Sequence, residues 1–443
     1  MDIRDLIVTP IILMLVYVGA YIVRPWVTDE VNRKYFLPAL TVRIIGAIAL
    51  GFLYQFYYEG GDTFNFHTHG SRLIWEAFCE SPLVGLKLLF SQGELTGDTF
   101  KHATRITFYL DPSSFFIVRI AAVFDLITFS SYTATAVLFG VFGFSGVWAL
   151  FITFYRQAPF QYRWIAFAIL FIPSVIFWGS GIMKDTVTLA FLGFLTFSIY
   201  TLFIKRKYSL WSVILLIVSA WVIYSVKKYI LLCFFPAALL WVYASLLQRI
   251  RSMVLRLLVI PIVMVILVLS AYYSVVLIGE NDPRYSLGKI AETAQITAYD
   301  IGFYTGKDAG SGYDLGELDG TFQGMIRLLP QAINVSLFRP YLWEIKNPLM
   351  LFSALESLAL LVISLYLLFK FRLQVFKAIV SPPVLFCLVF SLMFAFAVGV
   401  STFNFGTLAR YKIPLLPFYA LIIPLILDYL NKDKKLDALE ITE

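Results

Sequence analysis

Long apolar runs dominate this sequence and limit what the chain can fold into. A helix needs about 20 apolar residues to cross a hydrocarbon core. Only 14% of the 443 residues are charged, whereas about a quarter are charged in a soluble globular domain. Eleven probable spans lie at residues 5–23, 39–58, 131–155, 163–178, 186–204, 209–226, 229–247, 257–278, 348–369, 380–400 and 413–430. The sequence therefore predicts an all-α fold, a polytopic transmembrane helix bundle of about eleven spans that forms one integral membrane domain over residues 1–443.

A twelfth apolar stretch, at residues 114–130, carries Arg119 and Asp125 in its middle. Charged side chains inside a membrane are costly and are usually paired. We therefore expect this stretch to be a helix that lies in the interface or packs into the bundle.

Basic residues gather in short loops between the spans. The net charge is +7, from 35 Lys+Arg and 28 Asp+Glu, and short basic loops mark the cytoplasmic side of a membrane. The loops are those with Arg24, Arg33 and Lys34; Arg156 and Arg163; Lys205, Arg206 and Lys207; Arg249, Arg251 and Arg256; Lys370, Arg372 and Lys377; and Lys432, Lys434 and Lys435. This pattern predicts a multi-pass protein of a bacterial inner membrane, with its N-terminus outside, its C-terminus cytoplasmic, and no nucleic-acid partner.

Two long polar loops then fall on the extracytoplasmic side. They are residues 59–113 and 279–347, the second with the glycine-rich acidic stretch GKDAGSGYDLGELDG. Substrate chemistry is therefore expected on the outer face.

The segment EGGDTFNFHTHG at residues 59–70 follows the second span. Its glycines allow a tight reversal, after which Asp62 either caps the next helix or acts as a general base for an acceptor hydroxyl. His67 and His69 are either interfacial hydrogen-bonding residues or, with Asp62, ligands of a divalent metal. No other cofactor is indicated.

Three further segments place charges at the outer boundary. Lys184 and Asp185 begin a span, and either they pair locally or face headgroups, or Lys184 binds a lipid-linked phosphate. Arg339 either pairs with Glu344 or holds a phosphate through its planar guanidinium. Arg410 and Lys412 oppose the positive-inside bias, and they either reach the headgroups or bind an anionic ligand.

Glu356 lies inside the ninth predicted span. A carboxylate at that depth needs a partner or a polar cavity.

With these residues in place, the chain resembles the GT-C class of membrane glycosyltransferases. Asp62 in GGDTFNFH lies in the first large outer loop, about eleven spans are present, and Arg410-Tyr411-Lys412-Ile413-Pro414 forms a late Arg-Tyr-x-x-Pro element. The resemblance implies a polyprenyl-linked sugar donor, transfer on the outer face to a glycan or lipid acceptor, Asp62 as base or metal ligand, and basic residues on the donor phosphate. The outer basic residues are also similar to those of O-antigen-type polysaccharide polymerases.

The leading hypothesis is therefore a glycosyltransferase, or a polysaccharide polymerase, of cell-envelope biosynthesis. Asp62 is the expected catalytic residue. The expected substrate-binding residues are His67, His69, Lys184, Asp185, Arg339, Glu344, Arg410 and Tyr411. A transporter or flippase of lipid-linked oligosaccharide is the main alternative, and it would need polar groups near the midplane and broken helices. A structural or assembly subunit is the third.

Overall fold

The computed structural model describes residues 2–250, 288–304 and 311–440, together with the single residues 252, 269, 273, 276, 282, 284 and 286. Within these residues the elements are helices, and one isolated β-bridge joins Gly312 to Asn404. The all-helical fold predicted from the apolar runs is confirmed.

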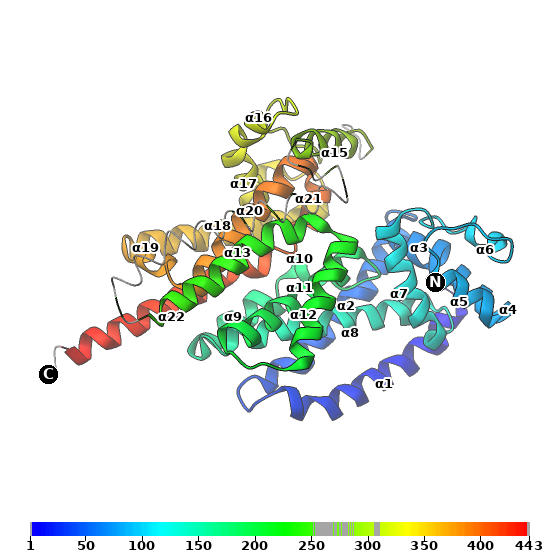
Figure 1. Cartoon of the computed structure of the whole chain (residues 1–443), viewed down its shortest axis with the longest axis horizontal. Helices are drawn as coiled ribbons and strands as arrows, with labels where there is room; N and C mark the ends of the chain where they lie inside the picture. Colours follow the sequence, from blue (N-terminus) through cyan, green and yellow to red (C-terminus); the bar gives the residue numbers. More distant parts are fainter. Residues whose placement is uncertain are drawn as a thin grey trace. The chain divides into compact units, whose positions relative to one another are not determined.

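Seven helices of the described residues are long and apolar enough to cross a membrane. They are α1 (Ile3–Val27), α2 (Arg33–Phe56), α8 (Tyr132–Tyr155), α11 (Lys184–Ile199) with η3 (Tyr200–Ile204), α13 (Lys228–Leu247), α18 (Pro348–Phe371) and α20 (Pro382–Thr402). An eighth candidate is the pair α21 (Phe405–Tyr411) and α22 (Leu416–Glu440), which is bent by 61° at the break. The chain is a multi-pass membrane protein, and Figure 1 shows the course of these helices.

Some predicted spans differ from the helices observed. The span predicted at residues 163–178 is divided into two helices, α9 (Tyr162–Leu170) and α10 (Pro173–Trp178). A proline disfavours helical backbone in the residue before it, which explains the break before Pro173. The span predicted at 209–226 is α12 (Leu210–Val226), shorter than the others. The span at 257–278 lies outside the described residues, so the total of eleven stays a prediction.

Both long polar loops contain helices. The first holds α3 (Asp62–Phe66), η1 (His67–Ser71), α4 (Arg72–Glu80), α5 (Pro82–Phe90) and α6 (Phe100–Ala103). The described part of the second holds α15 (Ile290–Tyr304), α16 (Phe322–Arg327), α17 (Leu329–Phe338) and η6 (Leu342–Glu344). The remaining short helices are η2 (Pro159–Gln161) and α19 (Gln374–Ile379). The apolar stretch predicted at 114–130 is α7 (Pro112–Thr128) and is packed into the protein, since Asp125 is fully buried.

The chain divides into two compact units. Unit 1 comprises Met1–Leu150, Val175–Leu195 and Ile217–Lys227, and unit 2 comprises Phe151–Ser174, Thr196–Leu216 and Lys228–Glu443. The predicted single integral membrane domain over residues 1–443 stays a prediction.

The core of unit 1 forms where α7 packs on α3, η1 and α4. Ile74, Val118 and Phe139 are fully buried there. Elsewhere in this unit α8 and α11 approach closely at Gly146 and Gly193, where an added Cβ on either residue would clash with the backbone of the other helix. Small residues allow such close approach between membrane helices.

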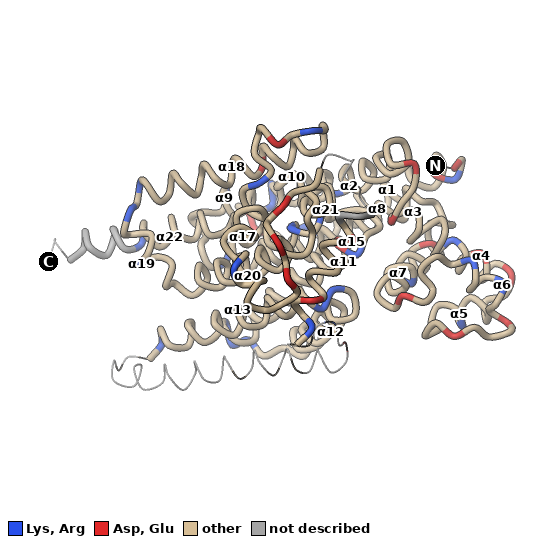
Figure 2. Tube along the Cα trace, turned by 90° about the horizontal axis from the view of Figure 1, so that it is seen from above, with Lys and Arg blue, Asp and Glu red and all other residues tan. Residues whose placement is uncertain are grey.

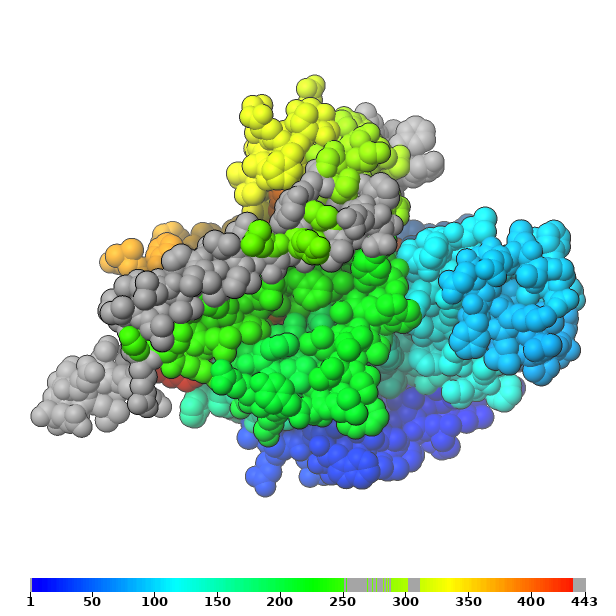
Figure 3. Space-filling model, viewed as in Figure 1, coloured from blue at the N-terminus to red at the C-terminus, as the bar shows by residue number. Residues whose placement is uncertain are grey.

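Helix α1 leaves most of its apolar surface uncovered. Only 11% of its most apolar window is buried, and Figure 3 shows the helix in dark blue, open along the face in view. An apolar surface of this size is expected to face lipid.

The core of unit 2 forms around α20, on which α13, α17 and α22 pack. Trp241 stacks on Phe386 with ring centroids 4.5 Å apart, and Phe390 meets Phe418 at 4.8 Å. Figure 2 shows how sparse charge is along such helices: in α13 the charged residue is Lys228, at its first position. Aromatic side chains, and not charged ones, make these contacts between α13, α20 and α22.

Candidate functional site

The chain reverses direction between α2 and α3 through Glu59, Gly60 and Gly61. All three residues have positive φ, at 54°, 142° and 116°. Glycine adopts the φ values of Gly60 and Gly61 at no steric cost. A Cβ added at Gly61 would lie 2.9 Å from the ring of Tyr54. The tight reversal predicted for the two glycines is confirmed.

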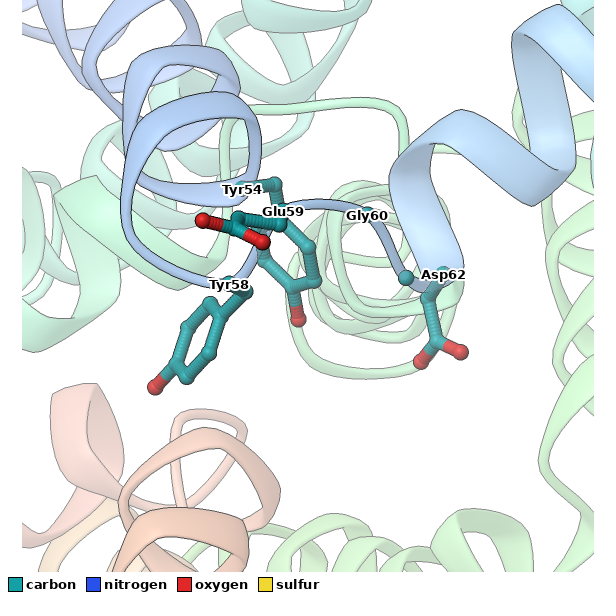
Figure 4. Close-up of a pocket in the computed structure, with 6 residues that line it drawn as sticks. Tyr54, Tyr58, Glu59, Gly60 and Asp62 are labelled. Carbon is teal, nitrogen blue, oxygen red and sulfur yellow. The ribbon is translucent and has the colours of Figure 1, made fainter.

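An open hollow of about 500 Å³ lies at this reversal, lined by Tyr54, Tyr58, Glu59, Gly60, Gly61 and Asp62. In Figure 4 the hydroxyls of Tyr54 and Tyr58 and the carboxylate of Asp62 lie on the same side of the turn. Two carboxylates and two phenols therefore border one space at the end of a membrane-spanning helix. Such groups suit hydrogen bonding to a polyhydroxylated ligand.

Asp62 is partly exposed and is the first residue of α3. Gly61 holds the N-cap position, so the prediction that Asp62 is the capping residue is wrong. A carboxylate in the first turn is still favoured by the helix dipole. The position keeps the Asp62 carboxylate within reach of the hollow.

His67 lies deep in unit 1, where Asp125 is the centre of a buried polar network. The Asp125 carboxylate accepts hydrogen bonds from Ser71 Oγ at 2.6 Å and Thr135 Oγ1 at 2.7 Å, and His67 Nε2 lies 3.3 Å from its Oδ1. The edge of the His67 ring meets the Tyr132 ring at 5.3 Å. This network holds η1 against α7 and α8.

The two histidines do not act together. His67 is fully buried, whereas His69 is exposed on the same short π-helix. Within the part of the chain that the structure describes, no group of three or more His, Cys, Asp or Glu side chains could hold a metal ion. The metal site suggested for Asp62, His67 and His69 is therefore not formed, and His67 is not an interfacial residue.

Lys184 contacts the start of α7. Its Nζ lies 2.7 Å from Ser113 Oγ and 3.4 Å from the carboxylate of Asp111, the N-cap residue of α7. Burial alone would raise the pKa of Asp111, but hydrogen bonds from Ser114 and Ser113 and the charge of Lys184 hold this pKa below its ordinary value. The Lys184 side chain is 19% exposed.

Asp185 forms a buried ion pair with Lys227, at the end of α12. Lys184 pairs with Asp111 whereas Asp185 pairs with Lys227; consecutive residues at a helix start point in different directions. Asp185 is fully buried and Lys227 is 8% exposed, which gives Asp185 a structural partner.

Arg339 and Glu344, in unit 2, form the pair that their spacing suggests. Nε and Nη2 of Arg339 both donate to the Glu344 carboxylate, at 3.1 Å from Nε. The rings of Tyr313, Tyr341 and Phe405 lie 5.4–6.0 Å from the guanidinium carbon. The hydrogen bonds that Arg339 donates to Glu344 raise the pKa of Arg339 above its ordinary value. This guanidinium is held rigidly, with Nη1 not engaged by Glu344.

The late Arg-Tyr element of unit 2 divides at the helix break. Arg410 and Tyr411 end α21 and are partly buried. Lys412 follows at the break and is 1% exposed, so the expectation that it reaches the headgroups is wrong. Its Nζ donates to Ser357 Oγ at 3.1 Å. Glu356, next to Ser357 in α18, accepts a hydrogen bond from Ser174 N at 3.1 Å through one of its two carboxylate oxygens.

Sequence reasoning missed Arg43, which lies within the second predicted span. It is 1% exposed, and Nη1 donates to the backbone oxygens of Val175 and Gly179 at 2.9 and 2.8 Å. An arginine inside an apolar run was a sufficient signal for a role in the bundle interior. By these bonds Arg43 fixes the turn that precedes Lys184.

The candidate residues thus fall into two sets. Unit 1 contains Asp62, His67, His69, Lys184 and Asp185, and unit 2 contains Arg339, Glu344, Arg410 and Tyr411. Comparison of the chain with family models, curated proteins and solved structures found no match.

Proposed function

We propose that this protein is a membrane glycosyltransferase that takes a sugar from a polyprenyl-linked donor on the extracytoplasmic face of a bacterial inner membrane. The observation that carries the proposal is the hollow at the end of α2, where the partly exposed carboxylate of Asp62 stands beside Glu59 and two tyrosine hydroxyls. The acceptor would be a glycan or lipid of the cell envelope.

In this mechanism Asp62 accepts the proton of the acceptor hydroxyl, as a positioned carboxylate can. The sugar C1–O bond to the donor phosphate breaks as the acceptor oxygen attacks, and the phosphate leaves as an anion. Positive side chains stabilise that developing charge most when they are fixed in advance. Lys184 is the candidate in unit 1.

The buried His67–Asp125 network supports this role indirectly. Thr63, the residue after Asp62, shares a hydrogen bond of 2.7 Å with Tyr132, whose ring meets His67. These contacts fix α3 and η1, and therefore the backbone that carries Asp62. His67 and Asp125 are positioning residues in this proposal.

The test is Asp62→Asn, with donor binding, turnover and melting temperature all measured. Asparagine keeps the size of the side chain but cannot take a proton, so turnover should fall by about 10²–10⁴-fold, with near-normal donor binding and stability. Turnover is followed as label transferred from a panel of polyprenyl-phosphate sugars in proteoliposomes, which are lipid vesicles that contain the purified protein. An active Asp62→Asn protein would remove Asp62 from the mechanism.

Glu59→Gln is the matched control, because Glu59 lines the same hollow and its carboxylate is lost in the same way. If Asp62 is the base, this variant should keep most of its turnover. Equal losses in both variants would mean that the hollow needs negative charge and not one base. Mass spectrometry of lipid retained by the purified protein supplies an independent check on the polyprenyl donor.

A transporter or flippase of lipid-linked oligosaccharide is the second candidate, and two observations favour it. Glu356 and Lys412 lie within or between membrane helices, and the α21–α22 pair is bent by 61° at Lys412. Discontinuous helices with buried ionisable groups are typical of transporters. Movement of lipid-linked oligosaccharide across proteoliposomes without sugar transfer would favour this function over the transferase.

A further inference from the structure

Helices α4 and α5 of unit 1 expose different kinds of side chain. The exposed residues of α4 are Cys79 and Glu80, whereas those of α5 include Leu83, Leu86 and Phe90. These three apolar side chains are 62%, 45% and 73% exposed. Their spacing of three and four residues places them on one face of the helix. Helix α5 therefore presents an apolar face, although it lies in a loop predicted to be polar.

The opposite face of α5 packs on α4. Leu88 is fully buried, and a Cβ added at Gly85 would lie 2.4 Å from the ring of Phe78 in α4. The two helices are therefore in close contact, with axes about 8–10 Å apart. The exposed apolar face takes no part in this packing, and exposed apolar surface of this kind marks contact with a membrane or with another protein.

Helices α1 and α8 begin side by side in the same unit. Asp5, in the first turn of α1, accepts hydrogen bonds from Ser131 Oγ at 2.6 Å and Thr133 N at 3.0 Å, at the start of α8. Both helices are long and apolar enough to cross a membrane. Their first turns therefore mark one boundary of the hydrocarbon core.

Two contacts join α4 to that boundary. Arg72, the first residue of α4, pairs with Asp2 at 3.3 Å. The guanidinium carbon of Arg4 lies 5.1 Å from the ring centre of Trp75. Asp2 and Arg4 stand at the start of α1, so α4 lies at the boundary and α5 is its immediate neighbour.

We propose that α5 lies in the membrane interface, with Leu83, Leu86 and Phe90 inserted into the leaflet at which α1 and α8 begin, the outer leaflet in the predicted topology. Amphipathic helices bind membranes in this way. A lipid leaflet is the partner because the helix stands at the end of α1, whose own uncovered apolar surface is expected to face lipid. This role of α5 does not depend on the proposed sugar transfer.

Lys87 is compatible with this position. It lies four residues after Leu83 and three before Phe90, on the same face of α5, and its Nζ pairs with Asp98 at 2.5 Å. A lysine at a membrane interface can lay its methylene groups along apolar surface while its ammonium stays among the headgroups. The Lys87–Asp98 pair would then mark the polar edge of the inserted face.

Nitroxide spin labels report which medium covers a side chain. The full-length protein is labelled in lipid nanodiscs, which are small discs of bilayer, and collisions of the label with oxygen and with a water-soluble nickel chelate are measured. Oxygen concentrates among acyl chains, whereas the chelate stays in water. Labels at Leu86→Cys and Phe90→Cys, each in the Cys79→Ser protein, should collide mainly with oxygen and should lie about 5–10 Å below the headgroup boundary.

The native Cys79 is the matched control, because it is exposed on α4, the neighbouring helix, while Cys233 and Cys387 are buried. A label on Cys79 should collide mainly with the chelate. Leu83→Cys gives a third position if a label at Leu86 or Phe90 lowers the melting temperature. The proposal is overturned if the α5 labels collide mainly with the chelate, as they would in water, or with neither reagent, as they would beneath a second copy of the chain or another protein.

Discussion

Replacement of Asp125 by alanine should be among the most destabilising single changes in unit 1. The carboxylate is fully buried and accepts hydrogen bonds from Ser71 at 2.6 Å and Thr135 at 2.7 Å, with His67 Nε2 at 3.3 Å. Alanine removes the acceptor of two buried hydroxyls and the carboxylate that lies beside His67 Nε2. Each unsatisfied buried group costs about 1–3 kcal/mol.

The total is smaller than two full penalties, because a hydroxyl can turn to another acceptor. Ser71 Oγ already lies 3.5 Å from the backbone oxygen of His67. We therefore expect Asp125→Ala to lower the free energy of unfolding by about 2–4 kcal/mol. Asp125→Asn keeps one acceptor oxygen and should cost about 1–2 kcal/mol.

Equilibrium unfolding in a mild detergent, followed by tryptophan fluorescence, measures these differences. Asp98→Ala is the control, because Asp98 pairs with Lys87 at 2.5 Å in the same unit but is 62% exposed. An exposed pair contributes little to stability, because water screens it. A loss in Asp125→Ala no larger than in Asp98→Ala would refute the view that this network holds α3 and η1 in place.

Three further predictions concern orientation, pH and the donor site. Cys79 is exposed in the first polar loop, whereas Cys233 and Cys387 are buried. A membrane-impermeant thiol reagent added to intact cells should therefore label one cysteine of this protein, and Cys79→Ser should abolish the labelling. A cysteine introduced by Lys207→Cys in the Cys79→Ser protein should react only after the cells are permeabilised. Hydrogen bonds from Arg284 and Lys228 hold the pKa of Asp282 well below its ordinary value. The ionised Asp282 carboxylate should therefore add about 1.5–3 kcal/mol to the free energy of unfolding at neutral pH, and this contribution should be lost as pH falls below about 4. The difference in unfolding free energy between wild-type protein and Asp282→Asn should shrink over that pH range. Lys184→Ala should weaken binding of a polyprenyl-phosphate donor by about 10-fold or more, measured by retained lipid, while Lys101→Ala, which removes an exposed lysine of the same unit, should not.

The helices were predictable because hydropathy alone specifies long apolar runs. The predicted span at 348–369 corresponds to Pro348–Phe371, and that at 229–247 to Lys228–Leu247. The break before Pro173 was not predicted, since an average over an apolar window is insensitive to one residue that stops a helix. The short helices of the two polar loops contain no long apolar run, so hydropathy gives no signal for them.

The candidate site was predictable only where the partners are close in sequence. Arg339 and Glu344 lie five residues apart, and their pairing was one of the two alternatives. Asp125 is 58 residues from His67, and no local pattern relates the two. Which side chains meet inside a bundle depends on tertiary packing, which a single sequence does not specify.

Buried charge also bears on the choice between the transferase and the transporter. The Asp185–Lys227 pair satisfies both of its members, so it requires no ligand and favours neither function. Glu356 differs, because one of its carboxylate oxygens lacks a partner among the described residues. A transferase that works only at the membrane surface has no need of such a group about 12 Å along a spanning helix. Sugar transfer that is lost in Asp62→Asn but retained in Glu356→Gln therefore identifies a transferase in which Glu356 takes no part, whereas lipid movement lost in Glu356→Gln and retained in Asp62→Asn identifies a transporter.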